Sequence, residues 1–344
     1  MNNFREVSSL LEALCAADGV SGTEDKAAKV AAEFLSKYMP VKIEPLGTVT
    51  GTTEGDGVHI MLEAHLDSIG MVVTAVDDDG FLKISGVGGV DARILAGAEV
   101  TVHGKEDLYG VILSTPPHLL PADEASKFRP ISETAVDIGM NKEKAQKLVT
   151  PGDRITFNGK FRRLLGNRVS CASLDDRAGV AAVLRCIQLL EGKNHGCKLT
   201  VSFCVQEETG GSGAATAAFT AQPDEAIGVD VSFAKAPDVC GDKYADLGKG
   251  PMIGYAPLLD YDMSNTLKTL AESRDIPYQI EVMGRGTGTD CDKIQIAGRG
   301  VRTALLSVPQ RNMHTAVEVC DLEDIENTAK LMAEYILERG GVNA

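Results

Sequence analysis

The chain has 344 residues, a length that predicts about two domains and a large hydrophobic core. Hydrophobic residues make up 44% and charged residues 24%, values that exclude disordered and fibrous proteins. Asp and Glu number 49 against 34 Lys and Arg, and the resulting net charge of -15 disfavours binding to nucleic acid or to an anionic membrane.

The cysteines form no CxxC pair, and most of them lie inside apolar runs. This pattern argues against a structural zinc site or a disulfide framework and predicts reduced, buried thiols. The first residues contain no apolar signal core, and no apolar run approaches the roughly 18 residues of a membrane helix. We therefore expect a cytoplasmic protein. The eight cysteines are Cys15, Cys171, Cys186, Cys197, Cys204, Cys240, Cys291 and Cys320.

In chain order, the first predicted elements are an amphipathic helix over 23–38 and a short apolar strand over 58–62. Ser21 and Glu24 have the spacing of a capping box. From about 69 to 163 the sequence becomes a series of short β-type runs separated by Gly, Pro and Asp turns, which predicts a small β-rich module. These runs cover 70–76, 99–103, 110–114 and 154–157.

After about residue 164 the predicted strands and helices alternate, which indicates an α/β sheet covered on both faces. We expect one α/β domain formed by 1–68 and 164–344, with the β-rich module of 69–163 inserted into it. The predicted helices cover 176–191, 213–220, 265–274 and 322–339, and the predicted strands cover 198–205, 225–233 and 303–308.

His65 and Asp67 follow the apolar strand, at the position where open α/β sheets bind ligands. In extended backbone these two side chains point the same way, so Asp67 can hold one nitrogen of a histidine whose other nitrogen binds a metal. The alternative is an incidental ion pair in a surface loop.

Asp175 and Asp176 open the helix predicted over 176–191. An Asp at that position is the ordinary helix N-cap, which explains one of the two carboxylates. The other must point elsewhere.

Glu207 and Glu208 end a strand of almost pure core character and are followed by glycines. Two buried carboxylates are rarely tolerated without a cation. A divalent metal would hold one as a ligand and leave the other as the base for an attacking water. A glycosidase pair is the competing interpretation, but adjacent residues poorly satisfy the separation of about 5–10 Å that it needs.

Asp230 lies inside an apolar strand, so it is a candidate metal ligand, with a Lys or Arg partner as the alternative. His314 follows the strand predicted over 303–308. The other histidines have no acidic constellation near them and are interpreted as ordinary residues. They are His59, His103, His118 and His195.

Together these candidates include two His, two Asp and two Glu that form one set, nearly all at strand ends of one sheet. This set suits two divalent cations that share a carboxylate, each also held by one His and one further carboxylate. The glycine-rich segment 284–290 could close over such a site, and no Walker A, GxGxxG or GxSxG signature is present.

The order of these motifs resembles the tetrahedral (TET) aminopeptidases, a family of dinuclear metallopeptidases whose members also carry the names glutamyl aminopeptidase and endoglucanase. The resemblance extends from residue 11 to the last helix. It rests on Ala64-His-Leu-Asp-Ser-Ile-Gly70, Ser173-Leu-Asp-Asp-Arg177, Val205-Gln-Glu-Glu208, Gly228-Val-Asp-Val-Ser232 and Met313-His-Thr315.

The resemblance implies a role for each site residue. Asp175 would bridge two metal ions, with His65 and Asp230 completing one site and Glu208 and His314 the other. Glu207 would be the general base, and Asp67 would orient His65.

The resemblance also implies a three-layer α/β/α catalytic domain with a mixed, zinc-exopeptidase-like sheet and an inserted β-barrel-like, PDZ-like dimerisation domain. It implies two divalent ions per subunit, zinc first with cobalt or manganese as alternatives, and a dodecamer built from dimers. Four positions depart from the family pattern and bear on side-chain preference: Ser68, 209–213, 286–290 and Asn312.

The expected activity is removal of N-terminal residues from peptides. The alternatives are another hydrolase on the same site, such as a deacylase or an endoglucanase, and a non-catalytic assembly protein, which is disfavoured because no ligand or base is missing.

Overall fold

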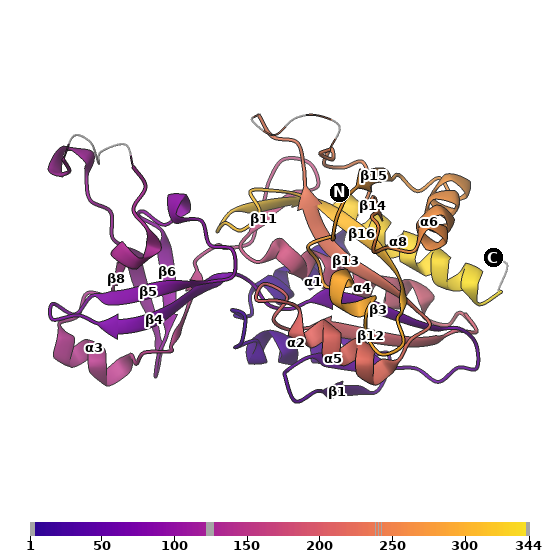
Figure 1. The fold of residues 1–344 in the computed structure, drawn as a ribbon, viewed down its shortest axis with the longest axis horizontal. Helices are drawn as coiled ribbons and strands as arrows, with labels where there is room; N and C mark the ends of the chain where they lie inside the picture. The colour runs from indigo at the N-terminus through magenta and orange to yellow at the C-terminus, as the bar shows by residue number, and fades with distance from the viewer. Residues whose placement is uncertain (1–3, 122–126, 238, 240, 242, 342–344) are drawn as a thin grey trace.

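The computed structural model describes residues 4–121, 127–237, 239, 241 and 243–341. Most of these residues form two lobes, a large sheet flanked by helices and a separate barrel (Figure 1). Within the described residues, none of the helices is long and apolar enough to cross a bilayer. The described cysteines form no disulfide with one another, and all but Cys15 are buried, as predicted for most of them. Cys240 lies outside the described residues.

An eleven-stranded mixed sheet forms the large lobe, with β3, β12, β13 and β16 running parallel at its centre. The central strands β3, β12 and β13 are buried along almost their whole length. This burial explains why their residues form nearly continuous apolar runs in the sequence. The strands in chain order are β1 (Val41–Ile43), β2 (Val49–Thr52), β3 (His59–His65), β10 (Arg162–Arg163), β11 (Arg168–Cys171), β12 (Lys198–Cys204), β13 (Glu225–Phe233), β14 (Met252–Tyr255), β15 (Gln279–Val282), β16 (Arg302–Arg311) and β17 (Glu318–Asp321).

Helices cover both faces of this sheet, as the predicted α/β/α class requires. Helices α1, α2, α4, α6 and α8 pack on one face, and α5 and α7 pack on the other. Their bounds are α1 (Arg5–Cys15), α2 (Asp25–Leu35), α4 (Leu174–Leu190), α5 (Ser212–Ala221), α6 (Tyr261–Ser273), α7 (Cys291–Ile294) and α8 (Leu322–Arg339).

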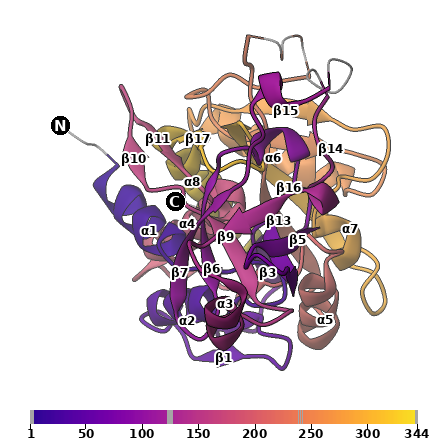
Figure 2. The ribbon, with the colours of Figure 1, turned by 90° about the vertical axis from the view of Figure 1, so that its left-hand side faces the viewer.

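The second lobe is a closed six-stranded barrel with its own apolar core, as the alternation of Val100 and Val102 into that core shows. In Figure 2 the barrel faces the viewer and the sheet lies behind it. The barrel strands are β4 (Gly70–Val76), β5 (Leu82–Val87), β6 (Glu99–His103), β7 (Asp107–Ile112), β8 (Ala135–Asp137) and β9 (Arg154–Phe157), with helix α3 (Lys142–Leu148) between β8 and β9.

Two sequence predictions about local structure are wrong. Ser21 and Glu24 do not form a capping box, because α2 begins at Asp25 without a side-chain cap. Glu24 Oε1 instead accepts hydrogen bonds from Gly22 N at 2.6 Å and from Gln206 N at 3.2 Å. The side chain expected to cap a helix therefore fixes the segment that follows β12.

His103 also differs from its prediction, since it does have acidic neighbours. Its Nδ1 lies 2.7 Å from Asp107 Oδ1 and 3.8 Å from Asp18 Oδ2. Lys26 Nζ lies 2.7 Å from Asp18 and 3.6 Å from Asp107, so this cluster joins the barrel to the connection between α1 and α2. Asp18 is distant in sequence, which hid the cluster.

A buried charge network fixes the start of β13 and yields a stability prediction. Glu225 is 2% exposed and accepts hydrogen bonds from Arg339 at 2.7 and 2.9 Å, from Tyr335 at 2.9 Å and from Arg302 at 3.0 Å. Glu225→Ala should lower the free energy of unfolding by about 2–3 kcal/mol, because the tyrosine and the guanidinium groups lose their acceptor. Thermal unfolding measures this loss. The exposed pair of Glu143 with Lys147 is the control, where Glu143→Ala should cost less than about 1 kcal/mol, and equal effects would contradict the prediction.

Candidate active site

The candidate residues meet at one edge of the sheet, where four central strands end. His65 is the last residue of β3, and Asp230 lies in the second half of β13. Glu207 and Glu208 follow β12, and His314 follows β16. The carboxyl ends of parallel strands lie at the same edge, so residues far apart in sequence converge there.

Asp175 lies between the two histidines. Its Oδ1 is 3.1 Å from His65 Nε2, and its Oδ2 is 3.3 Å from His314 Nε2. Asp230 Oδ1 lies 3.8 Å from the same His65 nitrogen, and Glu208 Oε1 lies 3.2 Å from the same His314 nitrogen. The side chains thus form two triads that share Asp175, and the potential ligand atoms of each triad lie within 4.8 Å of one another.

Both histidines present Nε2 to the carboxylates because Nδ1 is held from behind by a backbone carbonyl. His65 Nδ1 is 3.1 Å from the carbonyl oxygen of Asp67, and His314 Nδ1 is 3.2 Å from that of Gly89. A histidine that donates from Nδ1 presents the lone pair of Nε2. Two lone pairs facing carboxylate oxygens repel unless a proton or a cation lies between them, so this arrangement fits bound cations.

Asp67 does more than the sequence analysis predicted. Its carboxylate lies 3.5 Å from His65 Nδ1, while its backbone carbonyl makes the shorter contact. The two carboxylate oxygens accept hydrogen bonds from the backbone N–H groups of Glu207 at 3.0 Å and Glu208 at 3.1 Å. Asp67 therefore positions both glutamates as well as the histidine.

The paired aspartates have separate tasks. Asp176 Oδ1 accepts a hydrogen bond from Gly179 N at 2.9 Å and so caps the regular part of α4. Asp175 and Asp176 both have non-helical backbone angles, which turns the Asp175 side chain out of the helix toward the histidines. One aspartate therefore caps the helix and the other points away from it, as the sequence suggested for the pair.

Glu318 and Arg177 also organise the site, and sequence reasoning assigned a role to neither. Glu318, at the start of β17, is 2% exposed and accepts hydrogen bonds from Asp175 N at 3.2 Å and His314 N at 3.0 Å. Arg177 is fully buried and donates to the carbonyls of Leu66 and Leu14, each at 2.7 Å. For Glu318 the only sequence signal was its position four residues after His314, which is too weak to single this residue out.

The buried carboxylates of the site outnumber the two histidines that can carry a proton between them. Burial lowers the pKa of His65, but hydrogen bonds to carboxylates outweigh burial and raise it well above its usual range. Hydrogen bonds to Asp175 and Glu208 raise the pKa of His314 to about 11. Burial raises the pKa of Glu207 to about 7. Within the described residues, no Lys or Arg pairs with these carboxylates, and divalent cations would supply the missing positive charge.

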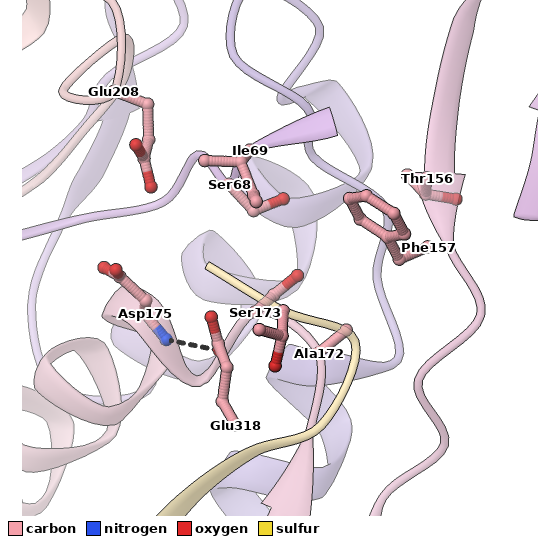
Figure 3. A pocket seen from close by; sticks show the side chains of 10 residues that line it. Ser68, Ile69, Thr156, Phe157, Ala172, Ser173, Asp175, Glu208 and Glu318 are labelled. Carbon is pink, nitrogen blue, oxygen red and sulfur yellow. Dashed lines mark hydrogen bonds between the residues drawn. The ribbon is translucent and has the colours of Figure 1, made fainter. Parts of the chain in front are cut away.

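A small cavity lies between the site and the barrel (Figure 3). Asp175 and Glu208 line it from the catalytic edge, and Thr156 and Phe157 of β9 line it from the barrel. The dashed line in Figure 3 marks the hydrogen bond from Asp175 N to Glu318. The barrel supplies none of the predicted ligands, but it forms one wall beside them.

The fold is that of known aminopeptidases. An aminopeptidase from the archaeon Desulfurococcus kamchatkensis matches with a TM-score of 0.92 and 32% identity, covering 97% of this chain and 95% of that one. The TET1 peptidase of Pyrococcus horikoshii, which can assemble into a tetrahedron or a large octahedral shell, matches with a TM-score of 0.86 and 33% identity, covering 96% and 99%. Fold and site therefore define a peptidase of the aminopeptidase class.

The sequence comparison gives the family. Residues 47–331 match the family described as M42 glutamyl aminopeptidase. The lysyl aminopeptidase of Pyrococcus furiosus is 34% identical over 339 residues, which cover 96% of each chain. The chain belongs to the M42 glutamyl aminopeptidase family, and the resemblance to TET aminopeptidases found in its motifs is confirmed.

Proposed function

We propose that this enzyme is a dinuclear metal-dependent aminopeptidase. The observation that carries the proposal is the position of Asp175, whose two oxygens each face a different His–carboxylate pair. His65 and Asp230 would complete one metal site, and Glu208 and His314 the other. The nitrogen and oxygen donors suit zinc, with cobalt or manganese as alternatives.

In this proposal Glu207 is the general base. When bound, the two ions would supply Lewis-acid polarisation of the scissile carbonyl and of the attacking water. Glu207 belongs to neither triad of potential ligands within the described residues, and its carboxylate is free to take a proton from that water and pass it to the leaving amine. Asp67 keeps Glu207 in place through the backbone N–H.

The test of this activity uses aminoacyl-p-nitroanilides, their Nα-acetylated forms and carboxymethylcellulose, each with and without chelator. We expect release of nitroaniline from the free-amine substrates only, abolished by chelator and restored by added metal. Hydrolysis of the acetylated form would indicate a deacylase or endopeptidase. Hydrolysis of the cellulose derivative alone would indicate an endoglucanase, and either result would overturn the proposal.

We further propose that residues 69–163 form an inserted dimerisation domain within the catalytic domain of 1–68 and 164–344. The barrel lobe supplies no predicted ligand, yet it exposes large apolar side chains, which favours contact with another protein surface. These side chains are Tyr109, Leu113, Leu119 and Phe128.

The free cysteines are consistent with function in the cytoplasm.

A dodecamer built from dimers is the assembly we propose, and light scattering tests it. The mass in the presence of metal should be close to twelve times the 36.4 kDa of the chain. Leu119→Glu, which places a charge on an exposed apolar position of the barrel lobe, should lower that mass. A wild-type monomer at micromolar concentration with metal present would contradict the proposal.

A further inference from the structure

A second group of potential ligands lies on the same face of the sheet, below the proposed metal centre. Glu63 comes two residues before His65 on β3, and its partner Gly228 comes two residues before Asp230 on β13. Alternate residues of a strand share a face, so Glu63 lies one step further into the sheet than the catalytic ligands. Cys204, which pairs with His65, ends β12 on the same face.

Asp290 completes this group from the opposite layer. It precedes α7, which packs on β13 and β16, and its carboxylate lies close to that of Glu63. One potential ligand atom each from Glu63, Cys204 and Asp290 lies within 4.8 Å of the other two. A side chain at Gly228 would collide with Cys291 Sγ and approach Glu63 Oε2 to 3.4 Å, so the glycine keeps this space open.

The carboxylates of this group are buried, and most of their oxygens have no hydrogen-bond partner within the described residues. Glu63 is 2% exposed, Asp290 3% and Cys204 fully buried. Glu63 Oε1 and both carboxylate oxygens of Asp290 accept no hydrogen bond within the described residues. The surrounding layer is apolar, with Met61 and Ile294 among its members, so two carboxyl groups there are costly unless a positive group joins them.

We propose that Glu63, Cys204 and Asp290 bind one further divalent cation per chain, separate from the dinuclear pair. A thiolate with two carboxylates is a donor set that selects zinc over magnesium or calcium. The ion links β3, β12 and the start of α7 directly beneath His65 and Asp230. It fixes the floor of the active site without taking part in the reaction.

A shared proton is the competing occupant. Burial raises the pKa of Glu63 to about 8 and that of Asp290 well above its usual range, so one proton held between the two carboxyl groups would also relieve the repulsion. A proton leaves Cys204 a thiol, whereas a cation of the zinc type makes it a thiolate ligand. The state of the sulfur therefore distinguishes the two.

Reconstitution with cobalt shows directly whether the Cys204 sulfur binds the metal. The proposed dinuclear ligands are nitrogen and oxygen only, so a sulfur-to-cobalt charge-transfer band in the near ultraviolet reports the additional site alone. The wild-type enzyme loaded with Co²⁺ should show this band. Cys204→Ala should abolish this band and lower the bound metal by one ion per chain. Cys186→Ala, which removes a buried thiol of α4 outside the group, should leave the band and the metal content unchanged.

Metal content and activity of the same samples separate this proposal from the proposed function. Asp290→Asn should also lower bound metal by one ion per chain, and it tests the site if Cys204→Ala does not fold. Wild-type enzyme that is active with two Co²⁺ per chain and no charge-transfer band would overturn the additional site and leave the aminopeptidase proposal intact. A band in a protein without peptidase activity would overturn only the latter.

Discussion

Glu207→Gln should lower the turnover of an aminoacyl-p-nitroanilide by about 10²–10⁴-fold while the protein keeps its bound metal ions. The amide has the shape of the carboxylate but cannot accept a proton from the attacking water. Metal binding should persist because neither of the two His–carboxylate triads includes Glu207. Steady-state kinetics and elemental analysis of the same preparation measure both effects.

The matched control for this variant is Glu338→Gln at the exposed end of α8. It removes the same charge far from the proposed base, so turnover and metal content should stay at wild-type values. Near-normal turnover by Glu207→Gln would remove this residue from the mechanism. Loss of metal along with activity would instead make it a ligand.

Asp175→Asn should lower the occupancy of both proposed metal sites, because each of its oxygens faces a different histidine. His314→Ala should empty mainly one site, since His314 belongs to only one triad. Activity should fall by several orders of magnitude in the first variant. Calorimetric titration of metal-free protein with Zn²⁺ gives the number of ions bound and their affinities.

Asp176→Asn is the control for the shared ligand. An asparagine oxygen can still accept the hydrogen bond from Gly179 N, so the cap of α4 is kept and metal binding should change little. If Asp176→Asn were the more damaging of the two changes, the bridging role would belong to Asp176.

The sequence predicted the layers of the fold because buried parallel strands and amphipathic helices leave different periodicities. The strand over 225–233 and the helix over 322–339 are found with the predicted bounds. The strand that carries His65 extends further than predicted, through the histidine itself, because the acid and histidine at its end interrupt the apolar pattern.

The arrangement of the site was predictable only in part. Acids at strand ends, such as Glu208 and Asp230, stand out because burying them without a cation is costly. The tasks of Glu24 and Glu318 were not predictable, because each acts on backbone N–H groups of segments that are distant in sequence or sharply turned. The carbonyl of Gly89, which holds His314, carries no side-chain signal at all.

Anomalous diffraction from crystals of the zinc-loaded enzyme tests the central claim most directly. The account predicts two peaks flanking Asp175, one also within about 2.0–2.2 Å of His65 and Asp230 and the other within that distance of His314 and Glu208. A further peak beside Cys204 would belong to the additional site. A single peak at Asp175, or none, would contradict a dinuclear centre.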